Sequence, residues 1–423
     1  MQQIASEALP ADAVISRWFR TRRDLADVDR AQILDLVYDV LRHHARLNWW
    51  LDRVVSPNTH SHRLFAWLVL DGTPSKRVDG LFAQAQGMSL PKSERELLYQ
   101  LHGSPIDHPD MPDKMRLECP DWAIDGLQQR FGERFDSEMR AALGNPPLDL
   151  RINPLKTTRE AMLSALRQLG LKPEPMSMSP LGIRLAERMS LAKLPMLKTG
   201  EVEIQDEGSQ LVAMLVEARA GDRVVDFCAG AGGKTLAIAA DMANKGHVVA
   251  CDIYEMRLKR AAERFRKAGL HNIETRLLSS ETDRWVKRHK EGFNRVLVDA
   301  PCSGTGTWRR NPDARWRPFE EEGLDKLVLL QGRILASAAR LVKPGGRLVY
   351  ATCSLLQAEN EHQITAFLAA RPDFRIVPLR AIFGDLPSDH PDHLSLTPAQ
   401  HRTDGFFAAV LQRDGGGSSS QQP

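Results

Sequence analysis

The sequence of 423 residues lacks the features of secreted and membrane-spanning proteins. Its longest apolar run, Leu64 to Leu70, is far shorter than the roughly 20 residues of a transmembrane helix. The segment Met1–Pro10 has no basic start followed by an apolar stretch, so we expect no secretory signal. The five cysteines have neither CxxC nor zinc-ligand spacing, and their odd number argues against a disulfide framework; they are Cys119, Cys228, Cys251, Cys302 and Cys353. We therefore expect free thiols, no metal and a reducing cytoplasm.

The sequence also has little net charge, +3, so a partner must be inferred from how the charges are distributed. From Arg257 to Lys290, eleven Lys and Arg residues stand against four Asp and Glu. From Trp308 to Arg317, four arginines are interleaved with two tryptophans. Basic and aromatic side chains together suit RNA, because its phosphates are anionic and its bases stack. The alternative for both stretches is an ordinary solvated surface.

No internal repeat is visible, and the length exceeds what one hydrophobic core organises. Apolar residues between Ala31 and Leu51 recur at helical spacing, which predicts a helical domain over 1–115. Pro, Asp and Gly cluster between Gly103 and Pro120 and mark its end. We predict a small α+β region over 116–200, a larger domain over 201–414 and a disordered tail over 415–423.

After residue 200, strand-like and helix-like segments alternate along the chain. Predicted strands occupy residues 223–228, 248–253, 273–278, 296–300, 347–352 and 406–411, and helices lie between them. This alternation predicts an α/β fold with a doubly wound, mostly parallel sheet. Ligands of such sheets bind at the carboxyl ends of the strands.

A glycine-rich loop, Asp226-Phe-Cys-Ala-Gly-Ala-Gly-Gly-Lys-Thr235, connects the first of these strands to a helix. Glycines there let a ligand approach the backbone, and the start of the helix leaves N–H donors free. A phosphate-binding P-loop would need glycine in place of Cys228, and a dinucleotide fingerprint would need glycine in place of Thr235. The remaining interpretation is the loop of an S-adenosylmethionine-dependent methyltransferase. Asp252, at the end of the next strand, could accept both ribose hydroxyls, or it could cap the following helix.

Two cysteines follow neighbouring strands, in Asp299-Ala-Pro-Cys302 and Thr352-Cys353-Ser354. Both thiols should therefore lie above the sheet, beside the cofactor. Carbon 5 of cytosine is a poor nucleophile, but attack by a thiolate at carbon 6 makes it enamine-like and able to accept a methyl group. A carboxyl group near N3 would stabilise the charge gained on attack. Release of the product then requires a second acid/base group.

Together these motifs resemble the Sun/Fmu (RsmB-like) family of ribosomal RNA cytosine methyltransferases. The likeness rests on Asp226-x-Cys-Ala-x-x-Gly-Gly-Lys-Thr, Asp299-Ala-Pro-Cys-Ser, Asn311-Pro-Asp-x-x-Trp, Tyr350-Ala-Thr-Cys-Ser and Asp404-Gly-Phe-Phe. Two upstream pieces also fit, Arg151-Ile-Asn-Pro-Leu-Lys156 and Gln205-Asp-Glu-Gly-Ser-Gln210. The resemblance implies a Rossmann-like S-adenosylmethionine methyltransferase domain, preceded by a helical, NusB-like domain and a small α+β region.

The resemblance also implies roles for single residues. Cys353 would be the nucleophile, Cys302 would assist release of the adduct, and Asp299 would contact the base edge. The cofactor would contact Cys228, Ala229, Gly230, Ala231, Gly232, Gly233, Lys234, Asp252 and Asp299. The loop reads Ala-Gly-Ala-Gly-Gly where the family usually has Ala-Ala-Pro-Gly-Gly, a change that is conservative in size. The family's usual acidic residue after the third strand is absent, so Ser279 or Ser280 becomes the candidate for bonding the adenine amino group.

We expect RNA as the partner of a monomer, with contacts from Arg151, Asn153, Lys156, Arg309, Arg310, Arg315 and Arg317. A transfer-RNA cytosine methyltransferase would share the catalytic motifs, although the helical N-terminal domain favours ribosomal RNA. A DNA cytosine methyltransferase would place its nucleophile in a Pro-Cys-Gln context, which Pro301-Cys-Ser lacks. A ribosome-assembly factor that only binds RNA would not need two thiols.

Overall fold

The structure, a computed structural model, describes residues 1–7, 9–185, 194–316, 323–384 and 390–415. The chain forms two compact units. The first contains Met1–Asn145 together with Trp308–Pro318, and the second contains Pro146–Thr307 and Phe319–Pro423. The boundary that we predict after residue 115 falls inside the first unit. Apart from Gly415, the tail predicted over 415–423 lies outside the described residues.

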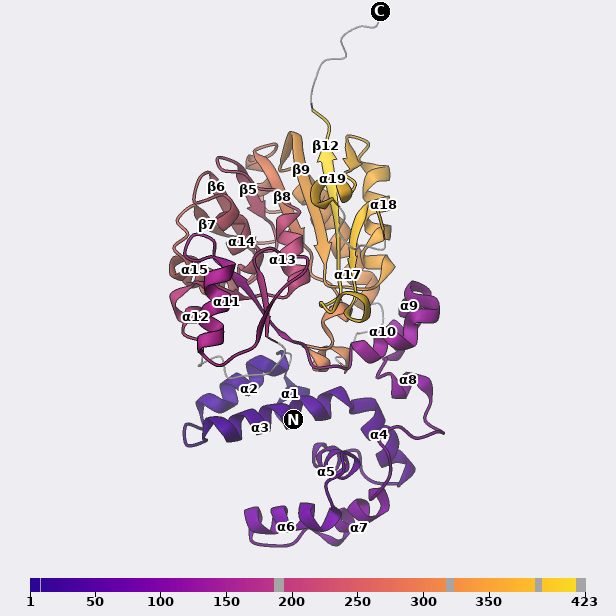
Figure 1. Ribbon diagram of the computed structural model, residues 1–423. Helices are drawn as coiled ribbons and strands as arrows, with labels where there is room; N and C mark the ends of the chain where they lie inside the picture. Colours follow the sequence, from indigo (N-terminus) through magenta and orange to yellow (C-terminus); the bar gives the residue numbers. More distant parts are fainter. Residues whose placement is uncertain (8, 186–193, 317–322, 385–389, 416–423) are drawn as a thin grey trace, which may run out of the picture. The chain divides into compact units, whose positions relative to one another are not determined.

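The first unit is built from helices, and those of residues 1–145 are drawn in indigo and purple in Figure 1. The helical stripe between Ala31 and Leu51 is divided between α3 and α4, because His43 leaves helical geometry (φ −109°, ψ 24°). Buried leucine and phenylalanine side chains such as Leu47 and Phe65 form the core. The helices are α1 Gln2–Ser6, α2 Ala11–Arg20, α3 Asp27–Arg42, α4 His44–Arg53, α5 His60–Leu70, α6 Ser75–Gln86, α7 Lys92–Leu101, α8 Asp113–Arg116, α9 Asp121–Phe131 and α10 Phe135–Ala141, with 3-10 turns η1 Gly132–Arg134 and η4 Pro312–Trp316.

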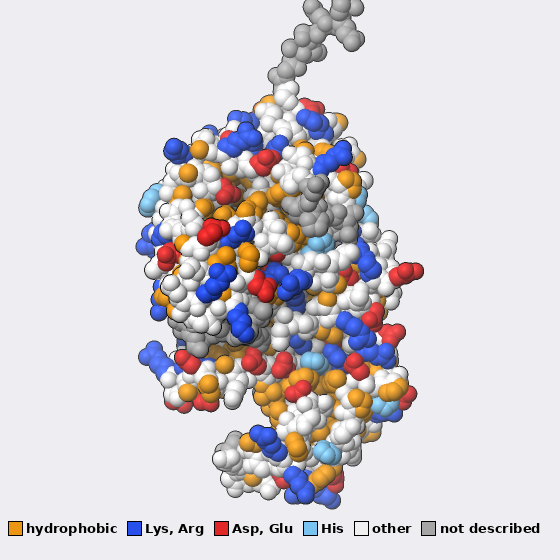
Figure 2. All heavy atoms as spheres, viewed as in Figure 1, with side chains coloured by type: hydrophobic (Ala, Val, Ile, Leu, Met, Phe, Trp, Pro, Cys, Tyr) orange, Lys and Arg blue, Asp and Glu red, His pale blue; other side chains and the backbone are white. Residues whose placement is uncertain are grey.

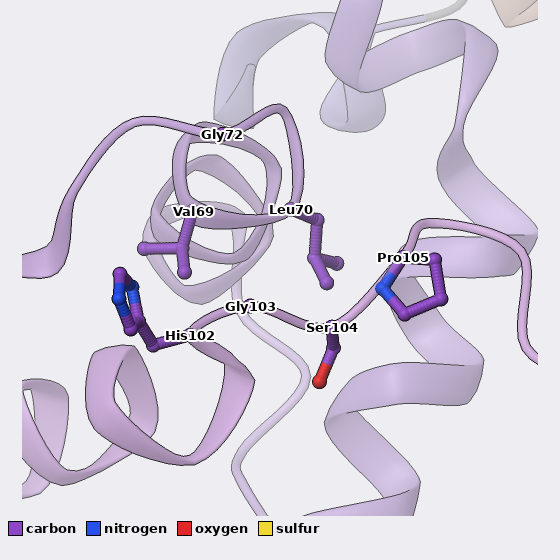
Figure 3. A pocket seen from close by; sticks show the side chains of 7 residues that line it. All are labelled: Val69, Leu70, Gly72, His102, Gly103, Ser104 and Pro105. Carbon is purple, nitrogen blue, oxygen red and sulfur yellow. The ribbon is translucent and has the colours of Figure 1, made fainter.

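A hollow of about 330 Å³ lies in this unit, between the end of α5 and the loop after α7 (Figure 3). It is lined by Val69, Leu70, Gly72, His102, Gly103, Ser104 and Pro105, none of which is a predicted site residue. In the described part of the chain, no helix is long and apolar enough to cross a membrane. The same residues contain no cluster of three His, Cys, Asp or Glu side chains that could hold a metal ion.

The second unit begins with a small antiparallel sheet in the order β2-β3-β1-β4. Its strands are β1 Leu148–Ile152, β2 Pro173–Pro175, β3 Gly182–Leu185 and β4 Val202–Ile204, and its helices are α11 Arg159–Gln168 and α12 Met196–Thr199. Leu150 and Ile152 of β1 pack against Met162 and Leu166 of α11, so one face of the sheet forms a core of its own. The predicted α+β character of this region is thus present.

The large sheet has the described order β10-β12-β9-β8-β5-β6-β7, and β11 pairs with β12. Strands β7, β6, β5, β8 and β9 are parallel, whereas β12, β10 and β11 run antiparallel to their neighbours. The strand order reverses between β5 and β8, which makes their carboxyl ends the place where a ligand binds in such folds. The strands are β5 Arg223–Asp226, β6 His247–Asp252, β7 Ile273–Leu277, β8 Phe293–Asp299, β9 Val342–Thr352, β10 Phe374–Ile376, β11 His393–Leu396 and β12 Phe406–Arg413.

Helices cover both faces of this sheet (Figure 1). One buried cluster joins α13, α14 and α15 to the sheet, and a second joins α17 and α18 to its other face. The predicted doubly wound fold is therefore confirmed. The helices are α13 Glu207–Met214, α14 Gly233–Asp241, α15 Glu255–Ala268, α16 Arg284–Arg288, α17 Gly323–Ala339, α18 Glu361–Ala370, α19 Arg380–Phe383 and α20 Pro398–His401, with 3-10 turns η3 Thr305–Thr307 and η5 Gln357–Glu359.

Candidate active site

A tight loop connects β5 to α14 at the point where the strand order reverses. Gly230 and Gly232 have φ values of 54° and 80°, which favour glycine. A Cβ atom on Gly232 would also lie 2.5 Å from the ring of Phe265 in α15. The loop therefore requires glycine for both conformation and space. The first turn of α14, which begins at Gly233, supplies N–H donors that have no partner within the helix.

Asp252, at the end of β6, holds this loop in place. Its Oδ2 accepts a hydrogen bond from the N–H of Gly230 at 2.8 Å, and its Oδ1 accepts one from the N–H of Tyr254 at 2.8 Å. Tyr254, and not Asp252, occupies the N-cap position of α15, so capping does not account for this carboxylate. Each carboxylate oxygen has a second lone pair for a ligand hydroxyl.

Lys234, in the first turn of α14, joins the loop to the end of β8. Its Nζ donates a hydrogen bond to Oδ2 of Asp299 at 2.7 Å, and the lysine side chain is buried. Burial alone would lower the pKa of Lys234, but the Asp299 carboxylate outweighs it and raises that pKa. Lys234 therefore stays protonated and presents a proton beside Asp299. Behind this pair, burial raises the pKa of Asp226 to about 7.

The two predicted catalytic thiols lie together. Strands β8 and β9 are parallel, and their register pairs Asp299 with Ala351, so the loops that follow begin at the same level. The Sγ atoms of Cys302 and Cys353 are 3.3 Å apart. The hydrogen bond with Cys353, followed by burial, raises the pKa of Cys302 well above its ordinary value. Cys302 thus keeps its proton, and either thiol can donate the hydrogen bond between the two sulfurs.

Hydroxyl groups follow β7, where the adenine contact is predicted. The N–H and Oγ of Ser279 both donate to Oδ2 of Asp283, at 2.9 and 2.8 Å, while Oγ of Ser280 lies 3.1 Å from Oγ1 of Thr282. Hydrogen bonds lower the pKa of Asp283 to about 2, and the bond from the Ser279 N–H has the largest effect. An ionised carboxylate therefore lies beside Ser279. The sequence analysis missed this acid because it stands later in the chain than the family's usual acidic residue.

The three residues predicted to bind RNA in the segment 151–156 contact protein oxygen atoms. Side chains of Arg151, Asn153 and Lys156 donate hydrogen bonds of 2.6–3.1 Å to oxygens of Gln205, Gly200, Ala268, Thr199 and Lys267. Arg151 and Asn153 are buried; Arg151 donates to Gln205, which follows β4, and Asn153 donates to Ala268, at the end of α15. Contact of these two residues with RNA stays a prediction. Lys156 is exposed and stays a candidate.

The segment Trp308–Trp316 contributes buried side chains to the first unit. Trp308 and Arg315 are each only 1% exposed, and the Arg315 guanidinium lies 4.8 Å from the centre of the Trp308 ring. Arg315 donates hydrogen bonds to the main-chain oxygens of Glu118, at 3.1 Å, and Ala142, at 2.7 Å. The segment thus serves as a structural element of the helical unit.

This burial concerns part of the predicted RNA interface. Arg315 and Arg309 are buried, Arg309 with 5% exposure, and their contact with RNA stays a prediction. Arg310 is partly exposed and stays a candidate. Arg317 lies outside the described residues.

The other basic stretch, residues 257–290, is exposed on α15, α16 and the loops around them. Its exposed cations are Arg257, Lys259, Arg260, Arg266, Lys267, Arg284, Lys287, Arg288 and Lys290. On the face shown in Figure 2, Lys and Arg side chains are mixed with Asp and Glu, without one large patch of a single sign. The 257–290 stretch is therefore the larger of the remaining candidates for RNA contact.

Glu359 is a buried acid near the thiols that the sequence analysis missed. Its carboxylate accepts hydrogen bonds from Ser303 and Ser354, the residues that directly follow Cys302 and Cys353. The only signal in the sequence is an acid six residues after Cys353, just before a helix. Acidic residues are common at such positions for general electrostatic reasons.

Comparison with known proteins places this geometry in a family. Residues 213–412 match the family described as 16S rRNA methyltransferase RsmB/F, and residues 119–192 match its ferredoxin-like domain. The chain is 32% identical over 426 residues to a Synechocystis protein named "Probable ribosomal RNA small subunit methyltransferase B", with 95% of each chain covered.

Two solved structures are also similar. The crystal structure of PH0851 is 25% identical and covers 97% of this chain and 96% of its own, with a TM-score of 0.81. A methyltransferase homolog protein from Pyrococcus horikoshii is 29% identical and covers 71% of this chain and 97% of its own, with a TM-score of 0.61.

Proposed function

This chain belongs to the RsmB/F family of 16S rRNA methyltransferases, and from that premise we propose that it methylates carbon 5 of a cytosine in small-subunit ribosomal RNA. Family membership supports methylation of RNA. The choice of cytosine carbon 5 rests on one observation, the 3.3 Å approach of the Cys302 and Cys353 sulfurs. A ribosomal RNA substrate would place the protein in the cytoplasm, and the exposed basic stretch 257–290 would make contacts with the RNA backbone.

The loop between β5 and α14 fits S-adenosylmethionine as the methyl donor. A Cβ atom on Gly230 would meet no protein atom within 4 Å, so the open space at this glycine suits close approach of a ligand to the backbone. Asp252 would accept hydrogen bonds from the ribose hydroxyls. The adenine amino group would donate a hydrogen bond to an oxygen of Ser279 or Asp283. Ser280 offers a second candidate hydroxyl. When bound, the cofactor supplies an electrophilic methyl group.

Cys353 would form the covalent bond to carbon 6 of the cytosine. The Cys302 sulfur lies within hydrogen-bonding distance of the Cys353 sulfur, so the Cys302 thiol can donate towards it during attack. On attack, the electron pair of the 5,6 double bond shifts through the ring and charge develops at N3. The proton held between Lys234 and Asp299 offsets this charge, and carbon 5 becomes enamine-like.

Release of the product then reverses the attack. A base must take up the carbon 5 proton, and solvent water can do so. The electron pair that the proton leaves behind expels the Cys353 sulfur. Cys302 lies beside that sulfur and would assist this step. The two thiols therefore have separable roles, attack and release.

Substitution of each thiol tests the proposal. Cys302→Ala should let attack and methylation proceed but block release, so a protein–RNA adduct should accumulate when RNA and S-adenosylmethionine are both present. Cys353→Ala should abolish methyl transfer and form no adduct, and the double variant should form none either. Denaturing gels would detect the adduct, and bisulfite sequencing of deproteinised small-subunit RNA would detect 5-methylcytosine.

Cys119→Ala is the matched control, because it removes a buried thiol outside both loops and should keep activity. Full activity in Cys353→Ala would contradict the mechanism. An adduct in Cys353→Ala instead of Cys302→Ala would reverse the two roles. Methylation of transfer RNA instead of ribosomal RNA would correct the substrate.

A further inference from the structure

Glu359 ends the short turn η5, which follows the Cys353 loop. Its side chain is fully enclosed, with 0% exposure. A buried carboxylate is costly unless hydrogen bonds compensate for the missing water. The groups that bind Glu359 therefore indicate what holds it in this position.

The Glu359 carboxylate accepts four hydrogen bonds. Oε1 accepts one from the N–H of Ser303 at 2.8 Å and one from Nε2 of Gln331 at 2.9 Å. Oε2 accepts one from the hydroxyl of Ser303 at 2.5 Å and one from the hydroxyl of Ser354. Gln331, in α17, also donates to the main-chain oxygen of Pro301 at 2.9 Å. One carboxylate thus receives donors from both cysteine loops and from a helix behind them.

Ser303 and Ser354 directly follow Cys302 and Cys353, so this carboxylate bridges the two loops immediately behind the thiols. We propose that Glu359 is a positioning residue that fixes the separation of the two catalytic thiols by accepting a hydrogen bond from the serine after each. The catalytic role of the thiols rests on the proposed function, whereas their positioning can be tested without methyl transfer. A loop displacement of about 1 Å can slow a reaction about a hundredfold, so such a bridge matters for rate.

The bridge is distinct from an effect of charge. The Cys302 pKa is raised first by the hydrogen bond with Cys353 and by burial, and the Glu359 charge adds to this. Glu359→Gln keeps the length of the side chain and both bridging atoms but removes the charge, since the serine hydroxyls can accept as well as donate. Glu359→Asp keeps the charge but is one methylene too short to reach both serines. The two variants therefore separate positioning from charge.

The experiment measures how fast diamide joins Cys302 to Cys353. Diamide takes up two electrons and two protons as the two thiols form a disulfide, and mass spectrometry of the bridged peptides gives the rate. This rate depends on the approach of the two sulfurs and needs neither RNA nor S-adenosylmethionine. Methyl transfer is measured in parallel on the same full-length variants, with kcat and the KM for S-adenosylmethionine determined separately.

We expect Glu359→Asp and Glu359→Ala to slow bridging and lower kcat by about tenfold or more, with KM for S-adenosylmethionine little changed. Glu359→Gln should keep both rates within about threefold of the original protein. Asp373→Asn is the matched control, because Asp373 pairs with Arg371 and Arg413 away from the thiols, and it should change neither rate.

If Glu359→Asp is active and Glu359→Gln is impaired, the charge of Glu359 matters and the positioning role is wrong. Bridging in Glu359→Ala at the original rate would overturn it as well. If Glu359→Ala does not fold, the Gln and Asp variants still decide. If the original protein methylates no cytosine while the bridging order holds, the proposed function fails and the positioning role stands.

Discussion

Two basic stretches of this chain have similar compositions and opposite environments. Residues 257–290 include nine Lys and Arg side chains that are exposed. In the segment 308–318, by contrast, Trp308, Arg309 and Arg315 are buried. Basic composition alone therefore does not distinguish a surface for RNA from a polar interior.

The difference follows from the spacing of apolar residues. In α15, Leu258, Ala261, Phe265 and Ala268 recur at intervals of three and four residues, so one face packs on the sheet and the cations lie on the other. The segment 308–316 has no such period. Its own tryptophan and arginine side chains form the buried surface, and the five donors of a guanidinium can satisfy main-chain oxygens there.

Arg315→Ala should have the largest effect on this comparison. The substitution leaves the main-chain oxygens of Glu118 and Ala142 without their donor and removes packing from the Trp308 ring. We expect the free energy of unfolding of the first unit to fall by about 2–4 kcal/mol, measured by urea denaturation with tryptophan fluorescence. Arg257→Ala, in the exposed stretch, should change it by less than about 0.5 kcal/mol. If both substitutions lowered the free energy of unfolding equally, the two basic stretches would not differ in their contribution to stability.

Glu118, whose main-chain oxygen accepts a hydrogen bond from Arg315, should make stability depend on pH. Burial raises the pKa of Glu118 from 4.5 to about 7. Between these values the folded state holds a proton that the unfolded state has released, so stability falls as pH rises from about 4.5 to about 7. The decrease can reach about 3 kcal/mol. Glu118→Gln should flatten this part of the profile in urea titrations at several pH values, and an unchanged slope would assign the dependence to another group.

The exposed stretch 257–290 should affect RNA binding instead of stability. Its effect should be smaller than that of Arg315→Ala on unfolding. We expect Arg260, Arg266 and Lys287, changed together to Gln, to leave the unfolding curve unaltered. The slope of log affinity for RNA against log salt should fall by about 0.7–0.9 for each RNA phosphate that the variant no longer neutralises. Arg375→Gln, on β10 at the opposite edge of the sheet, serves as the control. If the triple variant keeps the original slope, α15 and α16 are ordinary surface.

The local patterns predicted most of the second unit. Alternating strands and helices predicted the doubly wound sheet, and the positions of Cys302 and Cys353 after neighbouring strands predicted their proximity, which follows from parallel register. What could not be predicted depends on contacts between distant parts of the chain. The burial of Arg315 depends on Glu118, which stands far earlier in the sequence. The role that we infer for Glu359 likewise depends on the turn η5, which directs its side chain towards Ser303.

The return of residues 308–318 to the helical unit has a consequence during protein synthesis. Residues 1–145 leave the ribosome first, yet the unit that they begin includes a tryptophan and an arginine that are translated much later. The helices can form early, but their interior is completed only after the Cys302 loop has emerged, because that loop directly precedes Trp308. The part of the unit around Trp122 and Glu118 is thus among the last to mature, and a fragment cut at residue 145 would lack the buried Trp308 and Arg315.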